Sequence, residues 1–100
     1  MKLTIPNDRI ADFCRRWKIA EFSLFGSVLR DDFRPDSDVD VLVEFTPDHG
    51  WDLYDVVDMI DELKAIFSRD VDFVMKDGLR NPIRRKEILR TRRIVYDTKY

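Results

Sequence analysis

The sequence predicts a small domain of the α/β (α+β) class, in which helices flank a small mixed β-sheet. Three observations favour this class. Apolar residues recur every three or four positions in two long stretches, they alternate with polar residues in shorter stretches, and the two kinds of stretch follow one another along the chain. Such alternation is typical of layered domains built around one core. The length of 100 residues predicts a single domain over residues 1–100.

Each element has its own signal in the sequence. The expected order is a helix over residues 6–17, a strand over 19–25, a short helix over 26–30, a turn over 34–37, a strand over 38–45, a loop over 47–50, a helix over 52–67, a strand over 71–75, a basic helix over 82–90 and a strand over 93–96. Pro6 fits the first turn of the first helix, and Asp52 fits the N-terminal cap of the second long one. Along the 38–45 strand, valines alternate with polar residues, which predicts one buried face.

The two long helices each carry an apolar stripe that predicts their buried face. In the first helix the stripe consists of Ile10, Phe13, Cys14 and Trp17. In the second helix the expected buried residues are Leu53, Val56, Val57, Ile60, Leu63 and Phe67. Because Cys14 belongs to such a stripe, we expect a buried core thiol and not a nucleophile.

Composition excludes several classes of protein. The chain is 44% hydrophobic and 38% charged, and it has no apolar run long enough to cross a bilayer and no signal-peptide start. One cysteine cannot form an internal disulfide, which favours a cytoplasmic protein. The sole histidine, His49, has no cysteines to complete a zinc site, so we expect a loop residue. Trp51 is expected to pack and not to stack on a nucleotide.

Charge is distributed unevenly along the chain. Residues 31–62 hold twelve acidic residues and one arginine, whereas residues 80–93 hold seven bases and one acid. An acidic half can concentrate metal ions, and a basic end can meet phosphates or an acidic partner, although most such charges are simply solvated. The bases of the 82–90 helix spread around it without aromatic residues between them, so direct nucleic-acid binding is not expected. We favour a protein-partner face or general solvation there.

The most informative pattern is Gly26-Ser27, ten residues of spacing, and then Asp38-Val39-Asp40. A small-residue turn after a strand opens a short helix, whose free backbone N–H groups suit a phosphate. Asp38 and Asp40, two positions apart on a strand, project from one face, where a divalent cation would offset their repulsion. The pattern therefore indicates nucleotide chemistry.

An Asp-x-Asp pair alone is weak evidence, because two or three such pairs are expected by chance in a chain with sixteen aspartates. The pair Asp36/Asp38 straddles the predicted turn, which leaves Asp38/Asp40 as the candidate. Asp72 lies inside another strand and is a candidate third carboxylate, either as a metal ligand or as a general base. Asp70 competes with it on the same face, and an edge-strand residue that faces water is the alternative.

Together these residues resemble the polymerase-β-like nucleotidyltransferase superfamily and, more narrowly, the minimal nucleotidyltransferase (MNT) antitoxins paired with HEPN toxins. The resemblance covers residues 19–96 and includes Arg30, Ser37 and the strand around Val41. It implies that Asp38, Asp40 and Asp72 hold Mg²⁺, in a two-metal site, and carry catalysis. It also implies that Gly26 and Ser27 bind the phosphates of ATP, to which Arg30 would add a positive charge.

The resemblance further implies a function: transfer of AMP from ATP to a tyrosine of a partner HEPN ribonuclease toxin, which neutralises it. Two alternatives stay open, namely an antitoxin that only binds and occludes the toxin, and a nucleotidyltransferase that acts on a small molecule. The intact Gly-Ser and Asp-x-Asp pattern favours catalysis over mere binding. The sequence predicts neither the base preference, nor the number of AMP groups transferred, nor the stoichiometry with the partner.

Overall fold

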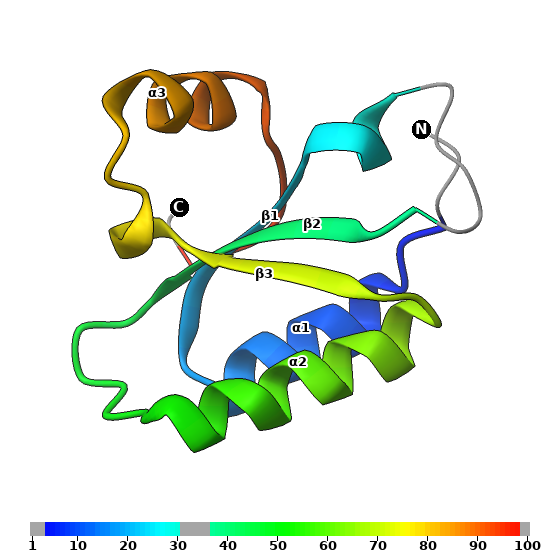
Figure 1. Cartoon of the computed structure of the whole chain (residues 1–100). Coiled ribbons are helices and arrows are strands. Elements are labelled where there is room, and N and C mark those ends of the chain that lie inside the picture. Colours follow the sequence, from blue (N-terminus) through cyan, green and yellow to red (C-terminus); the bar gives the residue numbers. More distant parts are fainter. Residues whose placement is uncertain (1–3, 31–36, 99–100) are drawn as a thin grey trace.

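In the part of the chain that the structure describes, four strands form one mixed sheet in the order β3-β2-β1-β4 (Figure 1). The structure, a computed structural model, describes residues 4–30 and 37–98. The strands are β1 (Ile19–Phe25), β2 (Val39–Phe45), β3 (Val71–Met75) and β4 (Arg93–Asp97). β1 runs antiparallel to both β2 and β4, whereas β2 and β3 are parallel. The predicted small mixed sheet is therefore confirmed.

Helices cover both faces of this sheet. On one face lie α1 (Asn7–Arg16) and α2 (Leu53–Phe67), and on the other lies α3 (Pro82–Thr91) (Figure 1). α2 connects the two parallel strands, which need a crossover because a tight hairpin cannot join them.

The alternation along β2 distributes its side chains between two clusters. Val39, Val41 and Val43 are fully buried and belong to the main core with α1 and α2. Leu42 belongs to a smaller cluster with Ile88 of α3. Because successive strand residues face opposite sides, Asp40 lies on the α3 side of the sheet.

Local signals explain where the helices begin. The side chain of Asp52 accepts a hydrogen bond from the backbone N–H of Asp55, and Asp55 accepts one from the N–H of Asp52, each at 3.0 Å. This capping box satisfies two backbone donors that the first turn leaves unpaired. At α3, Asn81 accepts from two backbone N–H groups, and Pro82 occupies the first helical position, where its lack of an N–H costs nothing.

The expected boundaries agree with the structure to within about two residues. β1 and β3 match their expected ranges, whereas β2 begins at Val39 and not at Asp38. The short helix is a 3₁₀ helix, η1 (Gly26–Leu29), and a second one, η2 (Lys76–Gly78), follows β3. Of the expected 34–37 turn, only Ser37 lies within the described residues. In the described part of the chain, no helix is both long and apolar enough to cross a membrane.

The predicted buried face of α2 is partly wrong. Leu53 is 75% exposed and Val57 is 50% exposed. The buried residues of α2 are Met59, Leu63, Ile66 and Phe67. Helical spacing allows either of two neighbouring stripes to face inward, and only the packing of the second half of α2 against the core selects between them.

Candidate active site

Asp40 and Asp72 lie side by side on neighbouring strands. In the parallel pairing of β2 with β3, the Cα partner of Asp40 is Asp72. Residues paired in this way point to the same face of a sheet, and adjacent strands lie about 4.8 Å apart. Asp40 is half-buried, whereas Asp72 is exposed on the edge strand β3. Asp38 is exposed immediately before β2. The structure therefore brings the predicted carboxylates together at the start of two strands.

The Gly26-Ser27 turn contacts this group of carboxylates. η1 begins directly after β1, and Phe25, the last residue of β1, is paired with Asp40. Gly26 has a φ of +73°, a left-handed value that favours glycine, and a β-carbon there would collide with the Asp40 carboxylate. The backbone N–H of Ser27 donates a hydrogen bond to the Asp40 side chain. The predicted phosphate-binding turn and the predicted metal-binding strand are thus in direct contact.

Burial raises the pKa of Asp40 above its ordinary value, and the charge of Asp72 raises it further. The hydrogen bond from Ser27 opposes this shift, Asp38 adds to it, and the charge of Arg84 opposes it. The surroundings of Asp40 therefore disfavour its negative charge relative to that of a solvated aspartate, and a cation beside it would offset this effect. A carboxylate in such surroundings is a suitable ligand for a hard divalent cation such as Mg²⁺, whose charge would stabilise the ionised form.

Within residues 4–30 and 37–98, no three His, Cys, Asp or Glu side chains are already arranged to hold a metal ion. The assignment of Asp38, Asp40 and Asp72 as metal ligands consequently stays a prediction. The same is true of the two-metal site.

A cavity of about 370 Å³ lies between η1 and α3, beside the Gly26 turn. It is lined by Phe25, Gly26, Leu29, Arg30, Glu87, Ile88 and Thr91. Arg30, which is exposed at the end of η1, therefore borders the same space as Gly26. The volume is within the range of small-molecule sites.

Arg84 is the residue that sequence reasoning missed. Arg84 is exposed, as expected for the basic helix, but its charge also lowers the pKa of Asp40, an effect that the sequence did not predict. A signal existed in the spacing: Arg84 lies one turn before Ile88, the buried residue of α3, and so lies on nearly the same side of that helix. What the sequence does not give is the position of α3 over the start of β2.

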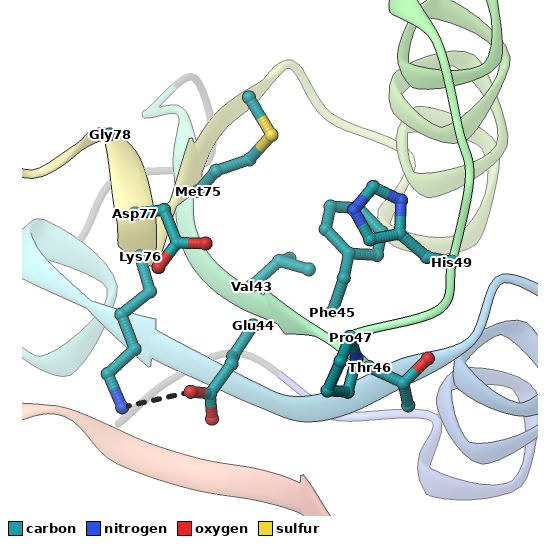
Figure 2. Close-up of a pocket in the computed structure, with 10 residues that line it drawn as sticks. All are labelled: Val43, Glu44, Phe45, Thr46, Pro47, His49, Met75, Lys76, Asp77 and Gly78. Atoms are coloured by element: carbon teal, nitrogen blue, oxygen red, sulfur yellow. Dashed lines mark hydrogen bonds and ion pairs between the residues drawn. The ribbon is translucent and has the colours of Figure 1, made fainter.

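A second cavity lies at the other end of β2 and β3 (Figure 2). It also measures about 370 Å³, and its lining includes His49, Met75 and the ion pair between Lys76 and Glu44, 3.5 Å apart. Asp40 and Glu44 are four residues apart on β2, about 13 Å at the usual rise per strand residue. This cavity is therefore separate from the group of carboxylates.

The structure confirms the structural roles expected for three other residues. Cys14 is fully buried, and burial raises the pKa of its thiol to about 12. His49 lies in a loop, where its Nδ1 accepts a hydrogen bond from the backbone N–H of Trp51. The Trp51 ring packs against Trp17 at 5.0 Å, and its Nε1 donates to the Trp17 carbonyl. None of these residues belongs to the candidate site.

The fold and the site define a class of protein, the nucleotidyltransferases. The chain resembles a solved structure of a candidate minimal nucleotidyltransferase, with a TM-score of 0.73 and 32% identity over 87% of this chain and 86% of that one. Two further structures show the same fold. A toxin–antitoxin crystal structure with AMP-PNP matches with a TM-score of 0.75 and 18% identity, over 95% of this chain and 76% of that one. A tri-AMPylated Shewanella oneidensis HEPN toxin in complex with MNT antitoxin matches at 0.61 and 20% identity, over 92% of this chain and 70% of that one.

Residues 8–95 match the nucleotidyltransferase domain family, and the chain belongs to that family. Among its relatives is the protein adenylyltransferase MntA of Thermococcus cleftensis, which is 36% identical over 75 residues. That match covers 75% of this chain and 73% of the relative. The resemblance inferred from Gly26, Ser27, Asp38 and Asp40 is therefore confirmed at the level of the family.

Proposed function

We propose that this chain is an antitoxin that transfers AMP from ATP to a tyrosine of a partner HEPN toxin in the cytoplasm and so neutralises it. The observation that carries the proposal is the contact between the Gly26-Ser27 turn and Asp40, with Asp72 beside Asp40 in the sheet. The name of the Thermococcus cleftensis relative supports adenylyl transfer to a protein. The toxin–antitoxin structures that share the fold support a toxin as the partner.

In this proposal Gly26 binds the nucleotide's phosphates through its backbone N–H and Ser27 through its hydroxyl, since the Ser27 N–H donates to Asp40, and Arg30 adds a positive charge. Asp38, Asp40 and Asp72 hold Mg²⁺. When bound, the metal supplies positive charge that stabilises the phosphate oxygens during transfer. The raised pKa of Asp40 fits this role, because the carboxylate gains most from a cation when its own surroundings disfavour its charge.

The transfer is a substitution at the α-phosphorus of ATP. The tyrosine oxygen forms the new bond to phosphorus, the bond to the leaving pyrophosphate breaks, and the hydroxyl proton passes to a base. Asp72 is the candidate base or the third metal ligand. Its exposed position on the edge strand leaves it accessible to an acceptor as large as a folded protein.

Intact-mass spectrometry of the protein encoded by the neighbouring gene, which the proposal expects to be a HEPN toxin, tests the proposal. After incubation with this chain, ATP and Mg²⁺, we expect added AMP, and we expect none with Asp40→Asn or after chelation of the metal. A stable complex without any mass change would replace the proposal with the binding antitoxin. AMP transfer to a small molecule, with the toxin unmodified, would replace it with the other alternative.

A further inference from the structure

Exposed apolar side chains gather at one end of the molecule, where α2 begins and β3 ends. In the described part of the chain six large apolar residues are exposed, and four of them are Leu53, Tyr54, Val57 and Met75. Leu53 and Val57 lie four residues apart on α2, and Tyr54 lies three residues before Val57. Residues with these spacings are neighbours on the surface of a helix, so the three α2 side chains form one exposed apolar group.

Met75 lies on the same side of the sheet and at the same end as this group. It is paired with Val43, which is buried in the main core together with residues of α2, so the two side chains point to the α2 side of the sheet. Because α2 runs back between two parallel strands, its first turn lies at the end of the sheet where both strands finish (Figure 1). We call Leu53, Tyr54, Val57 and Met75 the α2 apolar surface.

The cavity at this end of β2 and β3 adds a concave part to the α2 apolar surface. Met75 lies on one side of the cavity, and the rings of Phe45 and His49, whose centroids are 4.8 Å apart, lie on another (Figure 2). Protein interfaces gain most of their binding energy where a side chain of one partner fills such a pocket on the other. The cavity therefore suits a protruding side chain of a protein.

Negative charge borders the α2 apolar surface. Residues 44–63 hold seven acidic residues and neither lysine nor arginine. Asp58 and Asp61 are exposed one turn beyond Tyr54 and Val57, and Asp77 lines the cavity. Within residues 4–30 and 37–98, these three carboxylates belong to no ion pair. Their field repels nucleic acids and anionic lipids and attracts a basic surface.

The occupant that fits this chemistry is a protein face in which apolar side chains stand among lysines and arginines. The basic helix α3 of a second copy has such residues, including the exposed Ile83. However, α2 and α3 cover opposite faces of the sheet, so that contact would be head-to-tail and would not close as a two-fold dimer (Figure 1). A different protein therefore fits the surface better than a second copy does.

We propose that the α2 apolar surface is where the partner toxin docks, through a basic face of the toxin that has apolar side chains at its centre. This inference rests on the proposed function and adds a binding surface outside the group of carboxylates. Met75 lies three residues after Asp72 on β3, about 10 Å away at the usual rise per strand residue. A typical interface buries about 800 Å² on each partner, so a toxin docked here extends to Asp72.

Surface plasmon resonance with the purified protein of the neighbouring gene tests this inference. The chain carries Asp40→Asn in every measurement, so that binding is observed without AMP transfer. Leu53→Ser combined with Val57→Ser should weaken binding by roughly tenfold or more, because apolar anchors contribute most of the energy of an interface. Asp58→Lys combined with Asp61→Lys should slow association by roughly tenfold, and added sodium chloride should weaken binding of the unaltered surface.

Ile83→Ser is the matched control, because Ile83 is as exposed as the apolar residues of α2 but lies on the opposite face of the sheet. Weak binding by the Leu53→Ser/Val57→Ser variant, with no change in the Ile83→Ser variant, supports the inference. Equal losses in these two variants, or no loss in the first, overturn it. Thermal unfolding checks that each variant is folded, and the charge-reversed variant, altered only at exposed positions, decides the question if the first variant unfolds.

Two further outcomes separate this inference from the function on which it rests. Light scattering on the chain alone measures self-association, and a dimer that the Leu53→Ser/Val57→Ser variant loses would assign the surface to a second copy and overturn the inference. If the chain with an unaltered surface does not bind the neighbouring protein at all, the toxin partner of the proposed function is contradicted as well.

Discussion

Gly26 and Asp40 are in such close contact that a β-carbon at position 26 would collide with the Asp40 carboxylate. A side chain at residue 26 would therefore displace the Asp40 carboxylate from its place beside the turn after β1. Gly50 offers an instructive contrast. It has a similar φ of +67°, yet a β-carbon there would meet nothing within 4 Å.

We expect Gly26→Ala to lower both stability and activity. The left-handed backbone alone costs about 1–2 kcal/mol for a residue with a side chain, and the collision displaces Asp40 as well. A displacement of about 1 Å in a catalytic group can reduce the rate roughly a hundredfold. Gly50→Ala should show the backbone cost without the loss of activity. Urea unfolding and AMP transfer measured on both variants check this, and equal activity in the two would contradict the role of the contact.

Asp40→Asn should abolish transfer without destabilising the fold at neutral pH. Because the pKa of Asp40 is raised in the folded protein, the folded state binds its proton more tightly than the unfolded state does. The contribution of Asp40 to the free energy of unfolding is therefore largest at low pH. It decreases as the pH rises from the ordinary Asp pKa of about 3.9 through the raised pKa of the folded state. The Asp40→Asn variant has no carboxyl group to titrate at this position, so its stability should not show this decrease with pH.

Unfolding of the wild-type chain and of Asp40→Asn across about pH 4 to pH 7 measures this effect. The variant should become as stable as the wild-type chain or more stable toward neutral pH. Asp58→Asn, at an exposed position of α2, serves as the control. A variant that loses stability relative to wild type as the pH rises would show that the charged Asp40 stabilises the fold.

Added Mg²⁺ should stabilise the wild-type chain against heat. A ligand at about a hundred times its dissociation constant stabilises the folded state by about 2.7 kcal/mol, which raises the Tm of a domain of this size by at least several degrees. Asp40→Asn should lose most of this shift, and sodium chloride at equal ionic strength should not reproduce it. An equal shift in the variant would place the cation elsewhere.

The ion pair between Arg92 and Glu21 should contribute far more to the free energy of unfolding than the one between Arg90 and Glu87. The first pair is largely buried, with side-chain exposures of 17% and 7%, whereas the second is exposed at 65% and 61%. Arg92→Met leaves a carboxylate in a buried position and should cost about 3 kcal/mol. Arg90→Met should cost less than about 1 kcal/mol. Denaturant unfolding of the two variants provides the comparison, and similar values would refute it.

Much of the fold could be predicted from local patterns. β1 and β3 were bounded correctly because short apolar runs end at turn residues such as Gly26 and Asp77. The candidate site was predicted from the spacing between Gly26-Ser27 and Asp38-Val39-Asp40. The buried face of α2 could not be predicted fully from the sequence, because Leu53 and Val57 continue an apolar stripe that the sheet does not cover. The effect of Arg84 on Asp40 was missed for a related reason, because it depends on where α3 sits over the sheet, which is a matter of tertiary packing.

The position of β3 at the edge of the sheet has one more consequence. An edge strand offers unpaired backbone groups to any other extended chain, and the apolar residues of β3 would favour such pairing. Asp72 places a charge at the second position of this five-residue strand, between Val71 and Phe73. The residue proposed to act in transfer thereby also protects the chain from edge-to-edge aggregation. Replacing it with an apolar residue would remove both a proposed catalytic group and a charge that opposes aggregation.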